Sequence, residues 1–169
     1  MKKLILSTIL LIGLSFAAEA QNISKNALGL RIGGNNGFGG EISYQRAFSK
    51  KNRLEVDLGW RNNDDVDAVK MTGLYQWVWN IEGGFNWYAG VGGGLSIWDN
   101  NHYNNGNNDY NDYNEDGIYL FVAGDIGIEY DFKDAPIQIS LDLRPEIGFD
   151  TYNDDHLGLD LGLGIRYRF

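Results

Sequence analysis

In several segments the ionisable side chains fall on alternate positions, and the positions between them are apolar. In residues 157–169, Asp160, Arg166 and Arg168 share one parity with glycines, while leucine, isoleucine, tyrosine and phenylalanine fill the other. Side chains of a β-strand alternate between its two faces, so this spacing places ions on one face and apolar groups on the other. Acidic and basic groups that share an enclosed face can form ion pairs or line a path for ions.

The polar faces of all such segments together give the candidate site residues. An unpaired buried charge costs several kcal/mol, so we expect this set to form a paired network if the face is enclosed. Glycines at 90, 92, 94, 162 and 164 are expected to make room for the long side chains. The candidates are Arg31, Glu41, Arg53, Glu55, Asp57, Arg61, Lys70, Asp125, Glu129, Asp131, Asp142, Arg144, Glu146, Asp160, Arg166 and Arg168.

The elements that must position these residues are strands. Apolar residues at every second position predict eight strands, at 27–34, 39–48, 53–61, 67–79, 85–98, 118–132, 137–149 and 157–169. Short turns are expected at 49–52, 80–84 and 133–136, and longer polar loops at 62–66, 99–116 and 150–155. A connection at 35–38 is also short. This near-alternation of short and long connections is typical of membrane barrels, which have short periplasmic turns and longer outer loops.

The volume of the apolar side chains indicates which face is outside. The apolar rows hold about forty large side chains, whereas the interior of an eight-stranded barrel is only just wide enough to be filled by side chains. The apolar face must therefore point outward, toward lipid. The expected fold is an all-β, eight-stranded, antiparallel up-and-down transmembrane β-barrel. A soluble β-sandwich could bury many of the forty and is the alternative fold.

Aromatic residues lie near the expected strand ends. Membrane barrels carry aromatic belts at headgroup level, because such rings have an apolar body and a polar tip. Trp98 has the wrong parity for the outward row, which suggests a bulge or a side chain that caps the lumen. The expected belt comprises Trp60, Trp77, Trp79, Trp87, Phe132, Phe149, Tyr167 and Phe169.

The first twenty residues have the features of a secretory signal peptide. A basic start at Lys2 and Lys3 precedes an apolar run, and Ala18-Glu19-Ala20 forms an A-x-A cleavage pattern. The domain expected after cleavage is therefore 21–169. The chain carries a formal net charge of −9, which argues against a nucleic-acid partner. It has no cysteine, and hence neither a disulfide framework nor a thiolate metal site.

Two further features could support chemistry. Asp112, Asn114 and Asp116, followed by a glycine, match the opening of a calcium-binding loop. Alanine stands where the bidentate glutamate is expected, so we expect at most weak Ca²⁺ binding within 99–116, and no other cofactor. The two histidines, His102 and His156, both fall in expected outer loops, where a solvated side chain is the simpler interpretation.

Three features carry a family resemblance: the leader, the eight alternating strands and the closing Gly-Leu-Gly-Ile-Arg-Tyr-Arg-Phe. In these features the sequence resembles small outer-membrane β-barrels of the OmpA/OmpX type, whose barrel domain is similar to that of the porin family. The resemblance implies location in the outer membrane of a Gram-negative-type bacterium and contact with outer-membrane lipid. It also implies recognition of the C-terminal strand by the barrel-insertion machinery, and a monomer. Some small membrane barrels are lipid A deacylases or acyltransferases. No serine accompanies His156 in sequence, so we do not expect an enzyme.

Three functions follow as hypotheses. The first is an integral outer-membrane barrel with a structural or surface-interaction role and a lumen plugged by charged residues. The second is a narrow porin-like channel for small solutes or ions, in which the same residues line the path. The third is a soluble periplasmic binding protein with a β-sandwich fold.

Overall fold

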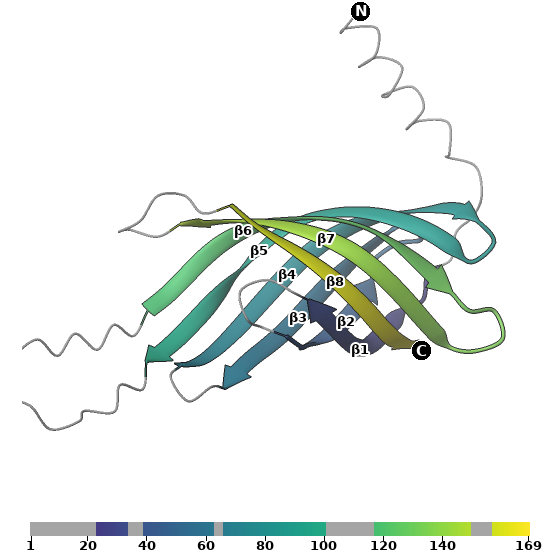
Figure 1. Cartoon of the computed structure of the whole chain (residues 1–169). Helices are drawn as coiled ribbons and strands as arrows, with labels where there is room; N and C mark the ends of the chain where they lie inside the picture. The colour runs from purple at the N-terminus through teal and green to yellow at the C-terminus, as the bar shows by residue number, and fades with distance from the viewer. Residues whose placement is uncertain (1–22, 34–38, 63–65, 101–116, 150–156) are drawn as a thin grey trace, which may run out of the picture.

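The protein forms a closed antiparallel barrel of eight strands (Figure 1). The computed structural model describes residues 23–33, 39–62, 66–100, 117–149 and 157–169. No helix within these residues is long and apolar enough to cross a membrane. The strands are β1 (Asn26–Gly33), β2 (Glu41–Ala47), β3 (Asn52–Asn62), β4 (Val66–Glu82), β5 (Phe85–Asn100), β6 (Gly117–Asp131), β7 (Ile137–Phe149) and β8 (Leu157–Arg168).

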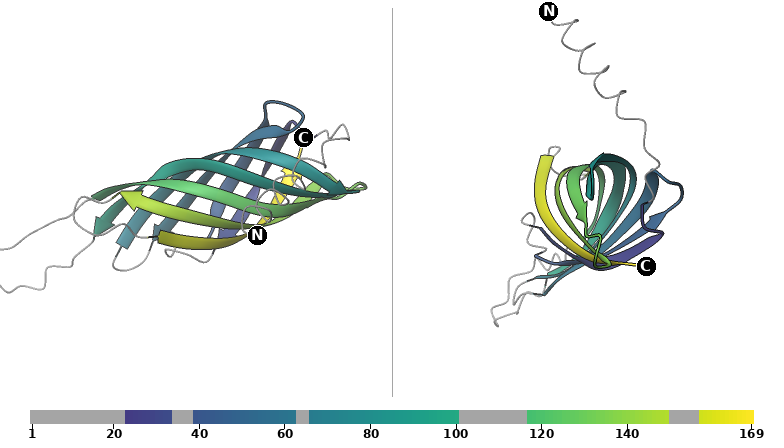
Figure 2. Two further views of the ribbon diagram at one scale, coloured as in Figure 1. Left: turned by 90° about the horizontal axis from the view of Figure 1, so that it is seen from above. Right: turned by 90° about the vertical axis from the view of Figure 1, so that its right-hand side faces the viewer.

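Each strand pairs with its sequence neighbours, and β1 pairs with β8 to close the sheet. In this closing ladder, Leu30 lies opposite Ile165. The strands are tilted and surround a central axis (Figure 2). The predicted eight-stranded antiparallel barrel is thus confirmed. The alternative β-sandwich is wrong, because a single closed sheet has no second sheet to pack against.

The two ends of the barrel differ in their connections. The β2–β3, β4–β5 and β6–β7 connections lie at one end, which we call the short-turn end. The start of β1 and the end of β8 are bonded there: the Phe169 N–H donates to the Asn26 carbonyl at 2.9 Å, and the Arg168 N–H donates to the Pro136 carbonyl at 2.7 Å. The other four connections start from the opposite end, which we call the loop end.

Strand boundaries around the β4–β5 hairpin differ from the prediction. β4 continues to Glu82 and β5 starts at Phe85, so the turn consists of Gly83 and Gly84 alone. Gly83 has φ of 59°, in the left-handed region that tight hairpins require and glycine adopts at little cost. A register irregularity between Asn80 and Glu82 precedes the turn. The predicted turn at 80–84 is therefore too long, because Asn80, although polar, still pairs with Asn86 in the β4–β5 ladder.

The distribution of side chains is the inverse of that in a soluble protein. Large apolar residues along the outward rows are exposed, including Leu159, Leu161 and Leu163 at 57%, 61% and 54%. Charged residues of the inward rows are buried, with Asp160 at 4% and Arg166 at 1%. A contiguous apolar surface of this extent marks contact with something other than water. The barrel therefore has a polar interior and an apolar exterior.

Candidate functional site: the charged barrel interior

The interior collects most of the candidate residues into one buried set. Among the residues that the structure describes, thirteen charged side chains point inward and are at most 5% exposed. Asp131 and Arg168 lie at the short-turn end, form a 3.5 Å ion pair and are partly exposed. The side chain of Arg61 is outside the described part of the structure. The buried set consists of Arg31, Glu41, Arg53, Glu55, Asp57, Lys70, Asp125, Glu129, Asp142, Arg144, Glu146, Asp160 and Arg166.

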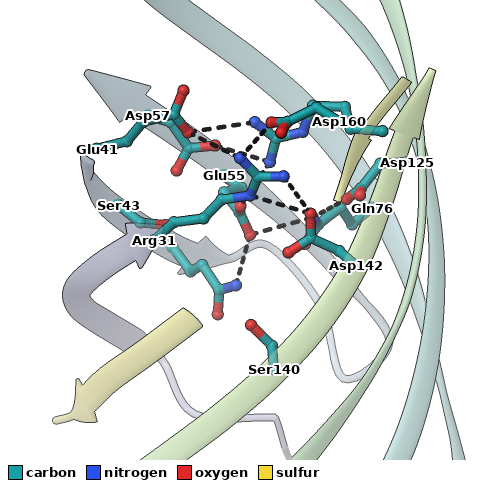
Figure 3. Close-up of polar contacts among 12 residues, drawn as sticks. Arg31, Glu41, Ser43, Glu55, Asp57, Gln76, Asp125, Ser140, Asp142 and Asp160 are labelled. Atoms are coloured by element: carbon teal, nitrogen blue, oxygen red, sulfur yellow. Dashed lines mark hydrogen bonds and ion pairs between the residues drawn. The ribbon is translucent and has the colours of Figure 1, made fainter. Parts of the chain in front are cut away.

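Arg31 joins four strands. Its Nη1 lies 2.7 Å from Asp160 Oδ2 on β8 and 3.2 Å from Glu41 Oε2 on β2. Its Nε donates to Asp142 Oδ1 on β7 at 3.0 Å, and Nη2 contacts the same oxygen. Figure 3 shows the guanidinium among these carboxylates. Its atoms occupy the space where a Cβ at Gly162 would stand, so the inward glycine makes room for it.

Glu55 lies at the centre of a second group. Its Oε1 accepts from Arg166 Nη2 at 3.1 Å and from Arg144 Nη2 at 3.2 Å. The same Arg144 Nη2 lies 2.9 Å from Asp57 Oδ2, and Arg144 Nη1 lies 3.7 Å from Glu41. Through Glu41 this group is continuous with that of Arg31. Hydrogen bonds in which both the donor and the acceptor are ionised are stronger than those between neutral groups.

Two further pairs cross between strands that are not neighbours. Arg53 Nη2 on β3 lies 2.7 Å from Glu129 Oε2 on β6. Lys70 Nζ on β4 donates to both carboxylate oxygens of Glu146 on β7, at 2.6 and 2.8 Å. Because each pair joins two strands that are not neighbours in the barrel wall, its side chains extend from the wall into the lumen to meet.

Neutral polar residues complete the network, and sequence reasoning did not single out most of them. Gln45 and Gln76 donate to Glu55 Oε2 at 2.6 and 3.1 Å. Arg166 donates to Ser43 Oγ at 2.9 Å and to Ser140 Oγ at 2.7 Å. Both serines and both glutamines share the inward parity of their strands, which is the sequence signal that identifies them as interior residues.

Acidic groups outnumber basic groups in this interior. The thirteen buried residues comprise eight acids and five bases. Seven of the acids have an ion pair with an arginine or lysine. Asp125 instead accepts from Gln76 Nε2 at 2.5 Å, and its Oδ1 has no hydrogen-bond partner among the described residues. The described interior charges therefore do not all form ion pairs, because Asp125 has only an amide donor.

The interior also contains apolar side chains that the sequence analysis missed. Leu74 and Phe121 are buried in one cluster, with Tyr119 packed against it. The Phe121 ring lies against Gly94, and Lys70 Nζ lies 4.9 Å from the ring centroid. The expectation that Gly94 accommodates an arginine or glutamate is therefore wrong, because an aromatic ring fills that space. Such rings reduce the volume left for water near the Lys70–Glu146 pair.

The predicted belt residues lie on the outward rows toward both ends of the barrel, unlike the buried Phe121. Trp79 and Trp87 stack across β4 and β5, with ring centroids 4.3 Å apart. Neither Trp77 nor Trp79 ends its strand as predicted, because β4 continues to Glu82. The side chain of Trp98 is outside the described residues. The predicted belt residues with described side chains are Trp60, Trp77, Trp79, Trp87, Phe132, Phe149, Tyr167 and Phe169.

Other predicted features fall outside the described residues. These are the leader, both histidines and the calcium motif at Asp112, Asn114 and Asp116. Among the residues that are described, no group of three or more histidine, aspartate or glutamate side chains has metal-site geometry. Calcium binding by 99–116 stays a prediction, which calorimetric titration of the folded protein tests.

Comparison with known proteins bears on the fold. No family model matches the sequence, and no curated protein matches it. The N-terminal β-barrel domain of Pseudomonas aeruginosa OprF superposes with a TM-score of 0.62 at 13% identity, covering 87% of this chain and all of that domain. Neisserial surface protein A (NspA) gives a TM-score of 0.56 at 11% identity, covering 85% of this chain and 94% of the other. The chain therefore shares its closed, antiparallel eight-stranded barrel fold with both of these proteins.

Proposed function

We propose that this protein is an integral outer-membrane β-barrel whose lumen is plugged by its own charged side chains and which serves a structural or surface-interaction role. The observation that carries the proposal is the inversion of the two faces. Exposed leucines and isoleucines cover the outside, and buried ions fill the inside. In hydrocarbon every backbone polar group needs an internal partner, which a closed barrel supplies. The fold shared with OprF and NspA supports the same location.

Insertion is tested first. The chain, refolded into detergent and into phospholipid vesicles, is expected to migrate on gels differently before and after boiling, because a barrel resists detergent unfolding until heated. It is also expected to stay with vesicles after an alkaline or urea wash. A chain that leaves the vesicles in the wash and shows one gel mobility overturns the proposal.

The plug is supported by the pairs that cross the lumen. Arg31 holds carboxylates from three other strands, and Lys70 reaches Glu146 on a strand that is not its neighbour. Eight strands enclose only enough space for side chains, so these contacts occupy the available bore. Surface contacts would then be made by the segments that connect strands at the loop end.

Planar-bilayer recording distinguishes the plug from the porin-like channel. We expect no steady conductance from the wild type and measurable leak from Lys70→Ala/Glu146→Ala, which removes one crossing pair. Lys133→Gln, an exposed residue of the β6–β7 turn, is the matched control and is expected to behave as wild type. Steady, reproducible conductance steps from the wild type would establish the channel instead.

A further inference from the structure

The exposed charges of the barrel are unevenly distributed between its ends. All exposed or half-buried lysines and arginines that the structure describes lie at the short-turn end. Four of them, Lys25, Arg46, Lys50 and Lys51, sit on the β1–β2–β3 sector, and we call them the basic rim. The exposed acidic residues that the structure describes are Glu82, at the end of β4, and Asp134, in the β6–β7 turn of that end.

The connecting segments of the opposite end have the reverse composition. Residues 34–38, 63–65, 101–116 and 150–156 contain nine aspartates and glutamates and no lysine or arginine. The sequence therefore gives acidic connecting segments to the strands of the loop end, whereas the described short-turn end carries exposed cations. An anionic surface is attracted to those cations.

Backbone and side-chain hydrogen bonds hold the rim in place. The Lys25 carbonyl accepts from the Ala47 N–H at 2.9 Å, and the Lys51 carbonyl accepts from the Val78 N–H at 2.8 Å. Ser49 Oγ accepts from the Lys51 N–H at 3.2 Å within the β2–β3 turn. The rim cations thus project from a fixed edge of the barrel.

The rim cations are not neutralised by the protein. None of the four forms an ion pair with any residue that the structure describes. Arg46 donates to the neutral Asn26 Oδ1 at 3.2 Å, which also accepts from the Tyr44 hydroxyl at 2.9 Å. Their charge is therefore available to a ligand.

The rim lies at the depth where lipid headgroups are expected. Phe48, in the same turn as Lys50 and Lys51, is 62% exposed, and Leu28 on the adjacent outward row is 46% exposed. Asn52, next to Lys51, donates to the Tyr75 hydroxyl on the outward row of β4. Aromatic groups with a polar tip favour the boundary between hydrocarbon and headgroups, and lysines near that boundary attract anionic lipids.

We infer that the basic rim binds anionic phospholipid headgroups in the leaflet at the short-turn end. This inference rests on the proposed insertion into a membrane. It specifies in addition which class of lipid the protein binds and in which leaflet. Phosphate oxygens accept hydrogen bonds from lysine ammonium and arginine guanidinium groups, while Phe48 and Leu28 contact the adjoining acyl chains. The acidic segments of the other end disfavour the same lipids there.

Tryptophan quenching by brominated lipids tests the inference on the folded full chain in vesicles. Asn52, next to Lys51, pairs with Trp77, so a variant that keeps only Trp77 reports on the rim. We expect brominated phosphatidylglycerol to quench Trp77 at least about twofold more than brominated phosphatidylcholine at equal content. The preference should fall in about 0.5 M NaCl, where the screening length is only a few ångströms.

Two sets of substitutions give the comparison. Lys25→Gln/Lys50→Gln/Lys51→Gln should bring the quenching ratio close to one. Lys133→Gln/Asp134→Asn, on the β6–β7 turn at the same end, should leave it unchanged. Equal quenching by both lipids in the wild type, or an undiminished preference in the triple variant, overturns the inference while insertion stands. Absence of quenching by either lipid overturns insertion itself.

Discussion

The pair of Lys70 and Glu146 offers a direct test of the proposed plug. Both side chains are about 95% buried, and Glu146 has this lysine as its only ion-pair partner in the described residues. Removing one partner of a buried pair leaves the other charge in a poorly solvated site, which costs about 3–5 kcal/mol. Lys70→Met and Glu146→Gln should each lower the free energy of unfolding by roughly that amount.

The double variant Lys70→Met/Glu146→Gln should cost far less than the sum of the two single changes. Once both charges are gone no ion is left unpaired, so we expect a coupling energy of about 2 kcal/mol or more, within the range seen for residues in contact. Urea unfolding in vesicles, followed by tryptophan fluorescence, measures all four members of the cycle. Lys133→Gln, which is exposed, should change stability by less than about 0.5 kcal/mol.

The reasoning fails if the single changes cost under about 1 kcal/mol each and simply add. That result would mean that both groups are hydrated in the folded protein, as in a water-filled channel. Conductance of the same variants in planar bilayers then shows whether that water is continuous through the barrel.

Three other predictions concern separate parts of the barrel. Arg144→Met removes the ion-pair partner of Asp57 and should lower stability by about 3 kcal/mol, and adding Asp57→Asn should recover part of that loss in urea titrations. The Tyr119 ring occupies the space over Gly148, so Gly148→Ala should destabilise the fold by about 1–3 kcal/mol, with recovery in combination with Tyr119→Ala. Leu161→Arg, on the outward face of β8, should cost about 2–4 kcal/mol in vesicles if it lies near the bilayer midplane. A value near zero would place that face in water.

The architecture could be predicted because one signal repeats along most of the chain. Strict alternation in 137–149 and 157–169 allowed only one assignment of inward and outward side chains. The predicted bounds of both strands agree with the structure to within one residue. The β4–β5 hairpin was harder, since Asn80 and the glycines of β5 look locally like breaks. Cross-strand hydrogen bonds overrode that local preference, because β4 and β5 pair along nearly their whole length.

The sequence predicted which charged residues face the interior, but it did not predict which of them form ion pairs with one another. Parity placed Arg31, Glu55 and Glu146 on inner rows, yet it could not say that Arg31 contacts Asp142 more than a hundred residues away. The alternation also could not predict that Phe121 lies among the charged residues. Phe121 is on an inward position of β6, and its ring fills the space over Gly94. Which side chains meet depends on strand tilt and stagger, which the sequence pattern does not contain.

By itself the sequence determined the strand number, the inward and outward rows and the apolar character of the exterior, because these depend only on the period of two along an extended chain. Tertiary structure decided the partners. Closure of β1 on β8 sets the register around the ring, and that register brings carboxylates from β2, β7 and β8 to Arg31 and carries Lys70 across to Glu146. Ion pairing acts over a few ångströms, so it is fixed only once the ring is closed.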